Sequence, residues 1–201
     1  MSDRVGRIRH DYRASRSSGT RPSSFISYFV VHDMEAANPH TAAEGTGAWF
    51  ASHAAQGSSH YGVDNDSTQQ YLPDTAIPWG APPLNMSGLH VECAGLASLS
   101  REQWLHSYGP MLQRLGWLMG KRCRAYRIPL RVLNVEQLRS CGTDPKRSCG
   151  GVVTNHTITD AFHKSTHTDP GPGFPMDVAL KWAHHYQTRG AWHRFSRKAK
   201  P

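Results

Sequence analysis

The chain has 201 residues, of which 38% are hydrophobic and 19% are charged, which suits one domain with a sizeable core. No hydrophobic run approaches the roughly 20 residues that cross a bilayer, so we expect no membrane span. The N-terminal stretch MSDRVGRIRHDYRAS carries arginines without a hydrophobic segment behind them, unlike a secretory signal. We therefore expect synthesis in the cytoplasm without a signal peptide.

The net charge of +8 is concentrated at the two ends of the chain. Residues 1–22 hold six arginines and two aspartates (+4), and residues 189–201 hold five arginines and lysines (+5), which leaves −1 for residues 23–188. We expect two basic end segments, the first of them flexible, around a nearly neutral domain at 23–188. Such ends favour a polyanion: nucleic acid, a membrane surface or an anionic cell wall. They carry few aromatic residues for stacking on bases, so specific nucleic-acid binding is not favoured.

The first half of the domain reads as strands alternating with a short helix. Residues 25–34 (FISYFVVHDM) form an aromatic and β-branched run, which predicts a buried strand with His32 near its end. Alanine-rich residues 41–57 predict a helix, and residues 58–73 predict two strands around a turn at 64–67. Residues 76–85 read as a loop with one helical turn, and residues 88–95 as a short strand.

The second half begins with the longest expected helix, residues 99–128. Ser100 and Gln103 form a capping box at its start, and Pro110 is expected to kink or split it. Strands are expected at 129–134 and 150–156, with a helical turn at 135–140 between them. A last helix is expected at 175–190, from Pro175 to Gly190. This alternation predicts an α/β single domain with a central, mixed β-sheet flanked by helices.

Cysteine and histidine content bear on metal binding. The four cysteines show no CxxC spacing, so a structural zinc ribbon is not expected. Cys141 and Cys149 bracket a polar loop and are either a local disulfide or two thiols. Thirteen histidines are far more than usual for this length.

Three polar residues stand where a metal site would need them. His32 and His156 lie at the ends of expected strands, and Asp169 lies on the stiff segment THTDPGPGFP (166–175). Two imidazoles and one carboxylate leave a fourth position for water, as in catalytic zinc sites. The alternative is that each side chain caps or packs locally.

Several segments occur together in a familiar order: FVVHDM, SSHYGVD, TQQYLP, LHVECAG, GVVTNH and HTDPGPGFP. Together they resemble the zinc-dependent N-acetylmuramoyl-L-alanine amidase family, which includes phage endolysins and shares its fold with the peptidoglycan recognition proteins. The resemblance covers residues 25–188. It implies one zinc ion per chain, held by His32, His156 and Asp169; the alternative places His167 or His163 on the metal.

The resemblance also implies catalytic residues. The family's strand carboxylate falls on Glu92, which would act as general base. His167 stands where the family often has a lysine, and would stabilise the developing oxyanion. The position of a tyrosine found in phage-type members is Ser59 here, which favours the glutamate-based mechanism.

The activity implied is hydrolysis of the amide between N-acetylmuramic acid and L-alanine in peptidoglycan. We expect a monomer that acts on the cell wall in phage-mediated host lysis. The alternatives are a cytoplasmic amidase that recycles muropeptides, or a non-catalytic peptidoglycan-binding module of the same fold. Candidate substrate-binding residues are His60, Tyr61 and Trp79, and the basic ends are candidates for binding anionic wall polymers.

Overall fold

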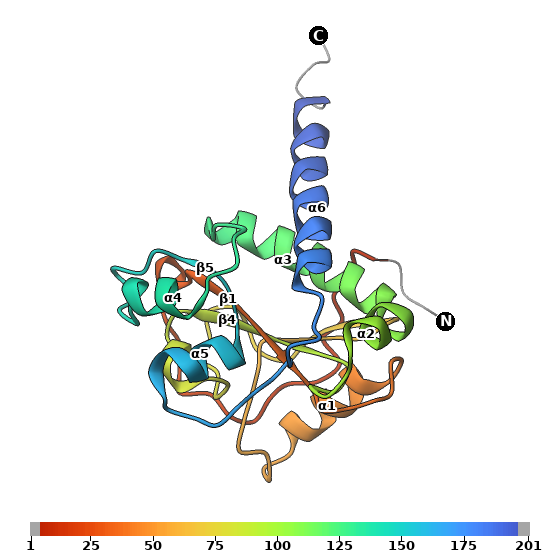
Figure 1. Ribbon diagram of the computed structural model, residues 1–201, viewed down its shortest axis with the longest axis horizontal. Coiled ribbons are helices and arrows are strands. Elements are labelled where there is room, and N and C mark those ends of the chain that lie inside the picture. Colours follow the sequence, from red (N-terminus) through yellow and green to blue (C-terminus); the bar gives the residue numbers. More distant parts are fainter. Residues whose placement is uncertain (1–4, 197–201) are drawn as a thin grey trace.

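The computed structural model describes residues 5–196, with side-chain environments up to residue 188. Its helices and strands alternate along the chain (Figure 1). In chain order they are η1 (Ser23–Phe25), β1 (Tyr28–Asp33), α1 (Ala42–Ala51), β2 (Tyr61–Val63), β3 (Thr68–Gln70), η2 (Pro82–Leu84), β4 (Gly88–Cys93), α2 (Arg101–Ser107), α3 (Gly109–Tyr126), α4 (Val135–Cys141), β5 (Gly151–Thr154), α5 (Asn155–Phe162) and α6 (Met176–Ser196).

Five strands form one mixed sheet in the order β3-β2-β4-β1-β5. Strands β2, β4, β1 and β5 are parallel, and β3 pairs antiparallel with β2 as the far edge. All six residues of β1 and all six of β4 are buried, as expected for central parallel strands covered on both faces. The expected α/β single domain with a mixed sheet is confirmed.

Helices cover both faces of this sheet. Phe29, Val31, Leu89 and Val91 point to the face covered by α3, which also carries α6 on its outer side. A Cβ built on Gly116 of α3 would lie 2.3 Å from the Cβ of Trp182 in α6, so glycine allows the two helices to touch. The C-terminal part of α6 extends away from the body (Figure 1). Helices α4 and α5 cover the opposite face.

The register of β1 and β4 places the candidate residues together. His32 is the pairing partner of Glu92, so the two side chains are neighbours on the α5 face, near the carboxyl ends of parallel strands. Open parallel sheets present their ligand sites at that edge.

Part of the N-terminal segment is integrated into the domain, unlike the flexible tail expected over residues 1–22. Its backbone runs along the β3 edge, where the Arg9 N–H donates to the Thr68 carbonyl and the Ala14 N–H to the Tyr71 carbonyl. Arg21 is buried and its guanidinium donates to the Gly88 carbonyl at 2.8 Å. The segment therefore covers a sheet edge that would otherwise be open to other chains.

Most expected elements are present, with a few differences. The expected long helix is split into α2 and α3 at Tyr108, with Pro110 in the first turn of α3, and the capping box of Ser100 is formed. Residues 129–134 contribute only an isolated bridge, from Val132 to Val152, and form no strand. Helix α6 continues past the expected end to Ser196.

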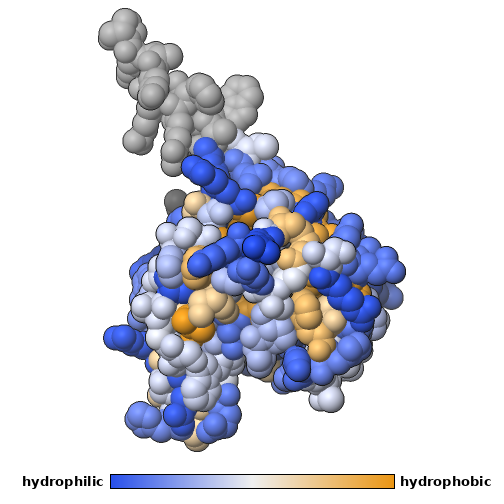
Figure 2. Space-filling model, turned by 90° about the vertical axis from the view of Figure 1, so that its left-hand side faces the viewer, coloured by the Kyte–Doolittle hydropathy of each residue, from blue (hydrophilic) through white to orange (hydrophobic). Residues whose placement is uncertain are grey.

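Two further findings concern the loops and surface. Cys141 and Cys149 form a disulfide, which the sequence left open. On the face that carries α4, hydrophilic residues predominate and hydrophobic ones are scattered among them (Figure 2). Within residues 5–196, no helix combines the length and hydrophobicity needed to cross a bilayer.

Candidate active site

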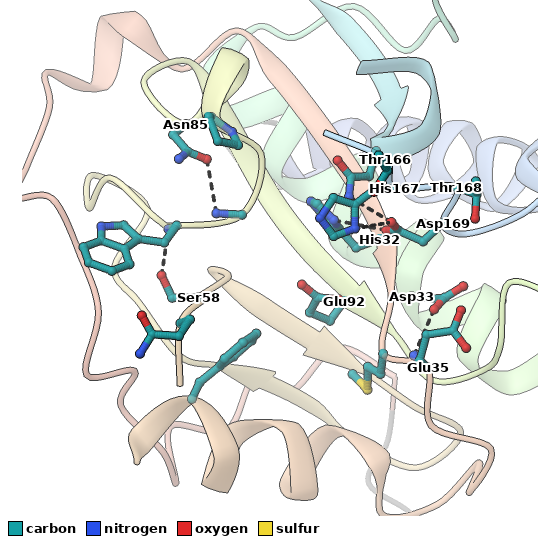
Figure 3. Close-up of a pocket in the computed structure, with 18 of the residues that line it drawn as sticks. His32, Asp33, Glu35, Ser58, Asn85, Glu92, Thr166, His167, Thr168 and Asp169 are labelled. Carbon is teal, nitrogen blue, oxygen red and sulfur yellow. Dashed lines mark hydrogen bonds and ion pairs between the residues drawn. The ribbon is translucent and has the colours of Figure 1, made fainter. Parts of the chain in front are cut away.

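A pocket of about 830 Å³ opens beside the ends of β1 and β4. Its floor carries His32, Asp33 and Glu92, and one wall is the loop 166–169 together with the start of α5. The opposite rim is formed by residues 56–58 and by the loop from Trp79 to Asn85 (Figure 3). The pocket therefore gathers residues from both halves of the chain.

His32 is held between a carboxylate and a second histidine. Its Nδ1 lies 3.2 Å from Asp169 Oδ2, and its Nε2 lies 3.0 Å from His90 Nδ1. His90 Nε2 faces the Leu84 carbonyl at 3.4 Å, so this nitrogen carries the proton and Nδ1 accepts from His32. The His32 ring is thereby fixed with its Nδ1 towards Asp169.

The ring of His90 is part of a buried group of imidazoles. Its backbone N–H donates to His60 Nδ1 at 3.1 Å, and His60 Nε2 donates to the Ala76 carbonyl at 3.1 Å. Burial lowers the pKa of His60 to about 3 and that of His90 well below its usual value, so both rings are neutral. A Cβ on Gly80 would lie 2.5 Å from the His90 ring, so glycine there makes room for it.

Asp169 is clamped by the first residues of α5. The Asn155 amide donates to Asp169 Oδ1 at 2.8 Å, and the His156 backbone N–H donates to the Asp169 carbonyl at 2.9 Å. Burial acts to raise the pKa of Asp169, but His32, Asn155 and His167 outweigh it, so the pKa is lowered. Asp169 is therefore ionised and fixed in orientation.

Glu92 lies in the same pocket, apart from the Asp169 group (Figure 3). Burial raises its pKa to about 8; His32 opposes this shift, and Asp169 and Asp33 add to it. Burial also raises the pKa of Asp33 to about 7. For His32, burial acts to lower the pKa, but the nearby carboxylates outweigh it and the pKa is raised. Glu92 is thus a carboxyl group that exchanges a proton near neutral pH.

The structure does not bring all three expected metal ligands together. His32 and Asp169 meet, but His156 lies one residue into α5, with its half-exposed ring 3.4 Å from Asp160 Oδ2. The register of β5 on β1 pairs Val31 with Thr154, so Asn155 rather than His156 follows on the face of His32 and lines the pocket. Among residues 5–196, no three histidine, cysteine, aspartate or glutamate side chains stand ready to hold a metal ion. Of the expected set, His32 and Asp169 therefore face one another in this structure, and His156 lies apart from them.

The alternative histidines are placed differently from one another. His167 lines the pocket, and its Nδ1 lies 3.5 Å from Asp169 Oδ1 (Figure 3). His163 ends α5 and contacts Arg139 at 3.3 Å, outside the pocket.

Of the expected substrate-binding residues, only Trp79 lines the pocket. Its indole N–H donates to Ser18 Oγ at 2.7 Å, and the Arg16 guanidinium lies over its ring. His60 and Tyr61 are fully buried, and the Tyr61 hydroxyl donates to Asp74 away from the pocket. Neither can contact a substrate there.

Sequence reasoning missed three residues of this site. Asn155 stands directly before the expected ligand His156, and the register of β5 on β1 decides which of the two lies on the face of His32. Asp33 follows His32 on the same strand, and a buried acid beside a strand-end histidine was a usable signal. His90 stands two residues before Glu92, and side chains two residues apart on a strand share one face of the sheet. The sequence alone could therefore have placed His90 beside Glu92.

Comparison with known proteins identifies the family and the fold of the chain. A family model described as N-acetylmuramoyl-L-alanine amidase matches residues 21–172. Staphylococcus aureus hydrolase AmiA, solved with its ligand, is 14% identical with a TM-score of 0.69 over 94% of this chain and 87% of AmiA.

Two further solved structures have the same fold. A mutant endolysin from Bacillus subtilis is 15% identical (TM-score 0.58; 90% of this chain, 98% of the endolysin). The N-acetylmuramoyl-L-alanine amidase LysC from Clostridium intestinale is 13% identical (TM-score 0.51; 87% and 95%). No protein of curated function matches the chain.

Proposed function

The chain belongs to the N-acetylmuramoyl-L-alanine amidase family, and on that premise we propose that it hydrolyses the amide bond between N-acetylmuramic acid and L-alanine in peptidoglycan. The observation that carries the proposal is the shared pocket of Glu92, His32 and Asp169 at the edge of the sheet. These are a base with a raised pKa, an imidazole and an ionised carboxylate, which together suit amide hydrolysis.

Glu92 is the proposed general base. Its pKa of about 8 lies near the operating pH, which favours transfer of a proton from water to a carboxylate oxygen. The same carboxyl group, once protonated, can give the proton to the nitrogen of the departing L-alanine. Burial of the side chain keeps bulk water from competing for this proton.

The family's zinc ion is part of the proposal, with one ion per chain. A bound zinc ion supplies polarisation of the amide carbonyl and acidification of a water molecule. His32 and Asp169 would hold it, since their facing atoms, His32 Nδ1 and Asp169 Oδ2, are 3.2 Å apart.

The rim opposite Asp169 is the proposed glycan side of the pocket. Trp79 presents a ring that is 39% exposed, and Ser18 and Arg16 fix its orientation. An aromatic face suits the apolar face of a sugar ring, because both can bury hydrocarbon surface without losing hydrogen bonds. The N-terminal segment therefore contributes to substrate binding through Trp79.

We propose the cell wall, during host lysis by a phage, as the setting. The basic ends support it, because they favour an anionic polymer. A recycling enzyme is the alternative setting. Faster hydrolysis of polymeric peptidoglycan than of soluble muropeptides would support the lytic role, and the reverse preference would support recycling.

A peptidoglycan-binding module without activity is the second candidate function. The placement of His156 favours it, because the Asn155 amide and not the His156 ring lines the pocket. A site without the third ligand binds zinc more weakly, while the pocket keeps the space needed to hold a peptide.

The deciding experiment is digestion of purified peptidoglycan, with new ends identified by mass spectrometry. We expect free L-alanine amino termini that disappear with a chelator and return with added zinc. Intact peptidoglycan that nevertheless retains the protein would refute the amidase and establish the binding module.

A further inference from the structure

The domain separates its charges, although they nearly cancel in sum. Residues 23–120 hold two arginines and eight acidic residues (−6), and residues 121–147 hold eight arginines and lysines and two acidic residues (+6). The second segment runs from the last turns of α3 through the loop 127–134 and α4 into the loop closed by the disulfide. The near neutrality of residues 23–188 is therefore the sum of an acidic part and a strongly basic part.

Cations from three segments lie together in this basic part. Arg127 caps the end of α3, one helical turn after Arg124. The loop that follows touches the disulfide loop, because a Cβ built on Gly150 would lie 3.1 Å from Pro129 Cδ. We call the exposed cations of these segments the basic face: Arg124, Arg127, Arg131, Lys146 and Arg147.

The basic face has few anionic partners within the protein. The side chains of Arg127, Arg131 and Lys146 form no ion pair or hydrogen bond with any described residue. Arg147 reaches Asp144 at 3.9 Å, but its side chain is 88% exposed, so this ion pair contributes little. Like charges gathered on one surface repel one another unless an anion lies against them. The basic face is therefore suited to an anionic partner.

The basic face and the pocket lie at opposite edges of the sheet. The Arg131 backbone contacts Gly151 at the amino end of β5, where Gly151 pairs with Tyr28 of β1. His32 and Glu92 lie near the carboxyl ends of β1 and β4, where the pocket opens. A partner held on the basic face therefore leaves the pocket free for substrate.

The composition of the basic part favours a phosphate polymer over a membrane or a nucleic-acid strand. Hydrophilic residues predominate on the side that carries α4 (Figure 2), and Val132 is the only exposed large hydrophobic residue within 121–147. Membrane surfaces are bound by cations together with apolar anchors. Nucleic-acid strands are bound by cations together with aromatic platforms. Tyr126 is the only aromatic residue within 121–147, and its hydroxyl donates to Asp74 at 2.7 Å.

We propose that the basic face binds a phosphodiester polymer of the cell wall and so holds the enzyme beside its substrate. The inference rests on the proposed function, which places the chain at the wall. Four of the five cations are arginines, whose planar guanidinium can donate two parallel hydrogen bonds to one phosphate. Arg124 donates to the Gln187 carbonyl of α6 at 3.3 Å, so the basic segment 189–201 begins beside this face.

Binding of the whole chain to cell walls, before and after acid extraction of their phosphate polymer, tests the proposal. A chelator is present to prevent hydrolysis. We expect tighter binding to the intact walls, and an affinity for them that falls as the salt concentration rises. The double variant Arg131→Gln/Lys146→Gln should weaken binding about tenfold at low salt. It should also reduce the slope of log affinity against log salt by about 1.5–2, since each phosphate contact contributes nearly one.

Lys164→Gln/Lys181→Gln is the matched control. Both lysines are exposed, lie outside the basic face and have no partner among the described residues, so this variant loses the same charge and keeps both basic ends. We expect it to change the affinity and the salt slope less than half as much. Thermal unfolding checks that each variant is folded. Equal losses in the two variants would overturn the proposal, because binding would then follow the total charge, and so would equal affinity for intact and extracted walls.

Competition identifies the class of partner. Long-chain polyphosphate should displace the wild-type chain from intact walls. Tighter binding to anionic lipid vesicles or to duplex DNA than to polyphosphate of equal phosphate content would overturn the assignment of the partner.

Hydrolysis of the extracted peptidoglycan is measured separately, without chelator. Its absence, with binding to intact walls retained, refutes the amidase and leaves the basic face standing. Hydrolysis by a chain whose two double variants bind intact walls equally well refutes the basic face and leaves the amidase standing.

Discussion

Glu92→Gln is expected to stabilise the metal-free protein while it removes the base. The side chain is 9% exposed, and burial raises its pKa from 4.5 to about 8. Since the folded-state pKa is higher than the unfolded one, folding favours the protonated form. The stability that this form provides is complete below about pH 4.5 and is lost as the pH rises through about 8. Glutamine has the shape of the protonated acid and has no proton to lose.

The magnitude follows from the two pKa values. The difference between 4.5 and about 8 corresponds to up to about 5 kcal/mol of unfolding free energy at alkaline pH. Asp169 and Asp33 contribute to the raised pKa, so part of the effect would remain shared with them. We expect the two proteins to be equally stable near pH 4.5, and Glu92→Gln to be the more stable by several kcal/mol at pH 9.

Urea unfolding at pH 5, 7 and 9, with a chelator throughout, measures this difference. Glu102→Gln is the matched control, because Glu102 is exposed at the start of α2 and should show no pH-dependent gain. In the loaded enzyme the same Glu92→Gln should reduce kcat by about 10²–10⁴-fold. A stability difference that is the same at all three pH values would refute the account of Glu92 as a buried acid with a raised pKa.

Three further substitutions test other parts of the structure. Trp79→Ala should raise KM for polymeric peptidoglycan about tenfold with little change in kcat, and an unchanged KM would exclude the indole as a sugar platform. His90→Ala should weaken Zn²⁺ binding about 10–100-fold, because the His32 ring loses the hydrogen bond that orients it. His90→Asn should recover part of the lost affinity, because its amide oxygen can accept that hydrogen bond. Equal losses of affinity in the two variants would contradict the role of the hydrogen bond. Gly116→Val should destabilise the fold by about 1–3 kcal/mol in urea unfolding, because a Cβ there would lie 2.3 Å from a side-chain atom of α6; Gly109→Ala, where a Cβ meets nothing within 4 Å, is the control and should cost much less.

The fold could largely be predicted from the sequence because its strong signals are local. The run ending at His32 is hydrophobic on both faces, as a central parallel strand must be, and the capping box of Ser100 marks a helix start by its own hydrogen bonds. The expected strand at 129–134 failed for a non-local reason. Only Val132 bridges to β5, and a strand needs a neighbour along its whole length.

The N-terminal segment shows the same limit of prediction from local sequence. Six arginines among residues 1–22 predict a solvated segment, yet Arg21 is buried with its guanidinium on backbone carbonyls. The composition gives the net charge of the segment. It does not show which arginine will meet enough hydrogen-bond acceptors to be buried.

The site was predicted to the extent that strand register fixes it. Glu92 and Asp169 were expected beside His32 because of the family resemblance, and the register of β1 and β4 brings His32 and Glu92 side by side. His156 was expected in the pocket, but the Asn155 side chain lies there in this structure. The register of β5 on β1 pairs Val31 with Thr154, so Asn155 and not His156 follows on the face of His32; α5 begins at Asn155, where the Thr154 side chain caps the helix, and His156 lies towards Asp160.

Asn155 therefore occupies the place in the pocket that was expected for His156. A helix start presents its buried face to the pocket, so an amide there can only orient Asp169. The loop that carries Asp169 also carries His167, and a loop side chain has the freedom that a helix residue lacks. The Asn155 amide and the His167 ring thus face Asp169 from two elements. Asn155→His should leave the fold intact and tighten Zn²⁺ binding, because it adds an imidazole beside His32 and Asp169; weaker binding in Asn155→His would show that the amide's hold on Asp169 matters more than an added imidazole.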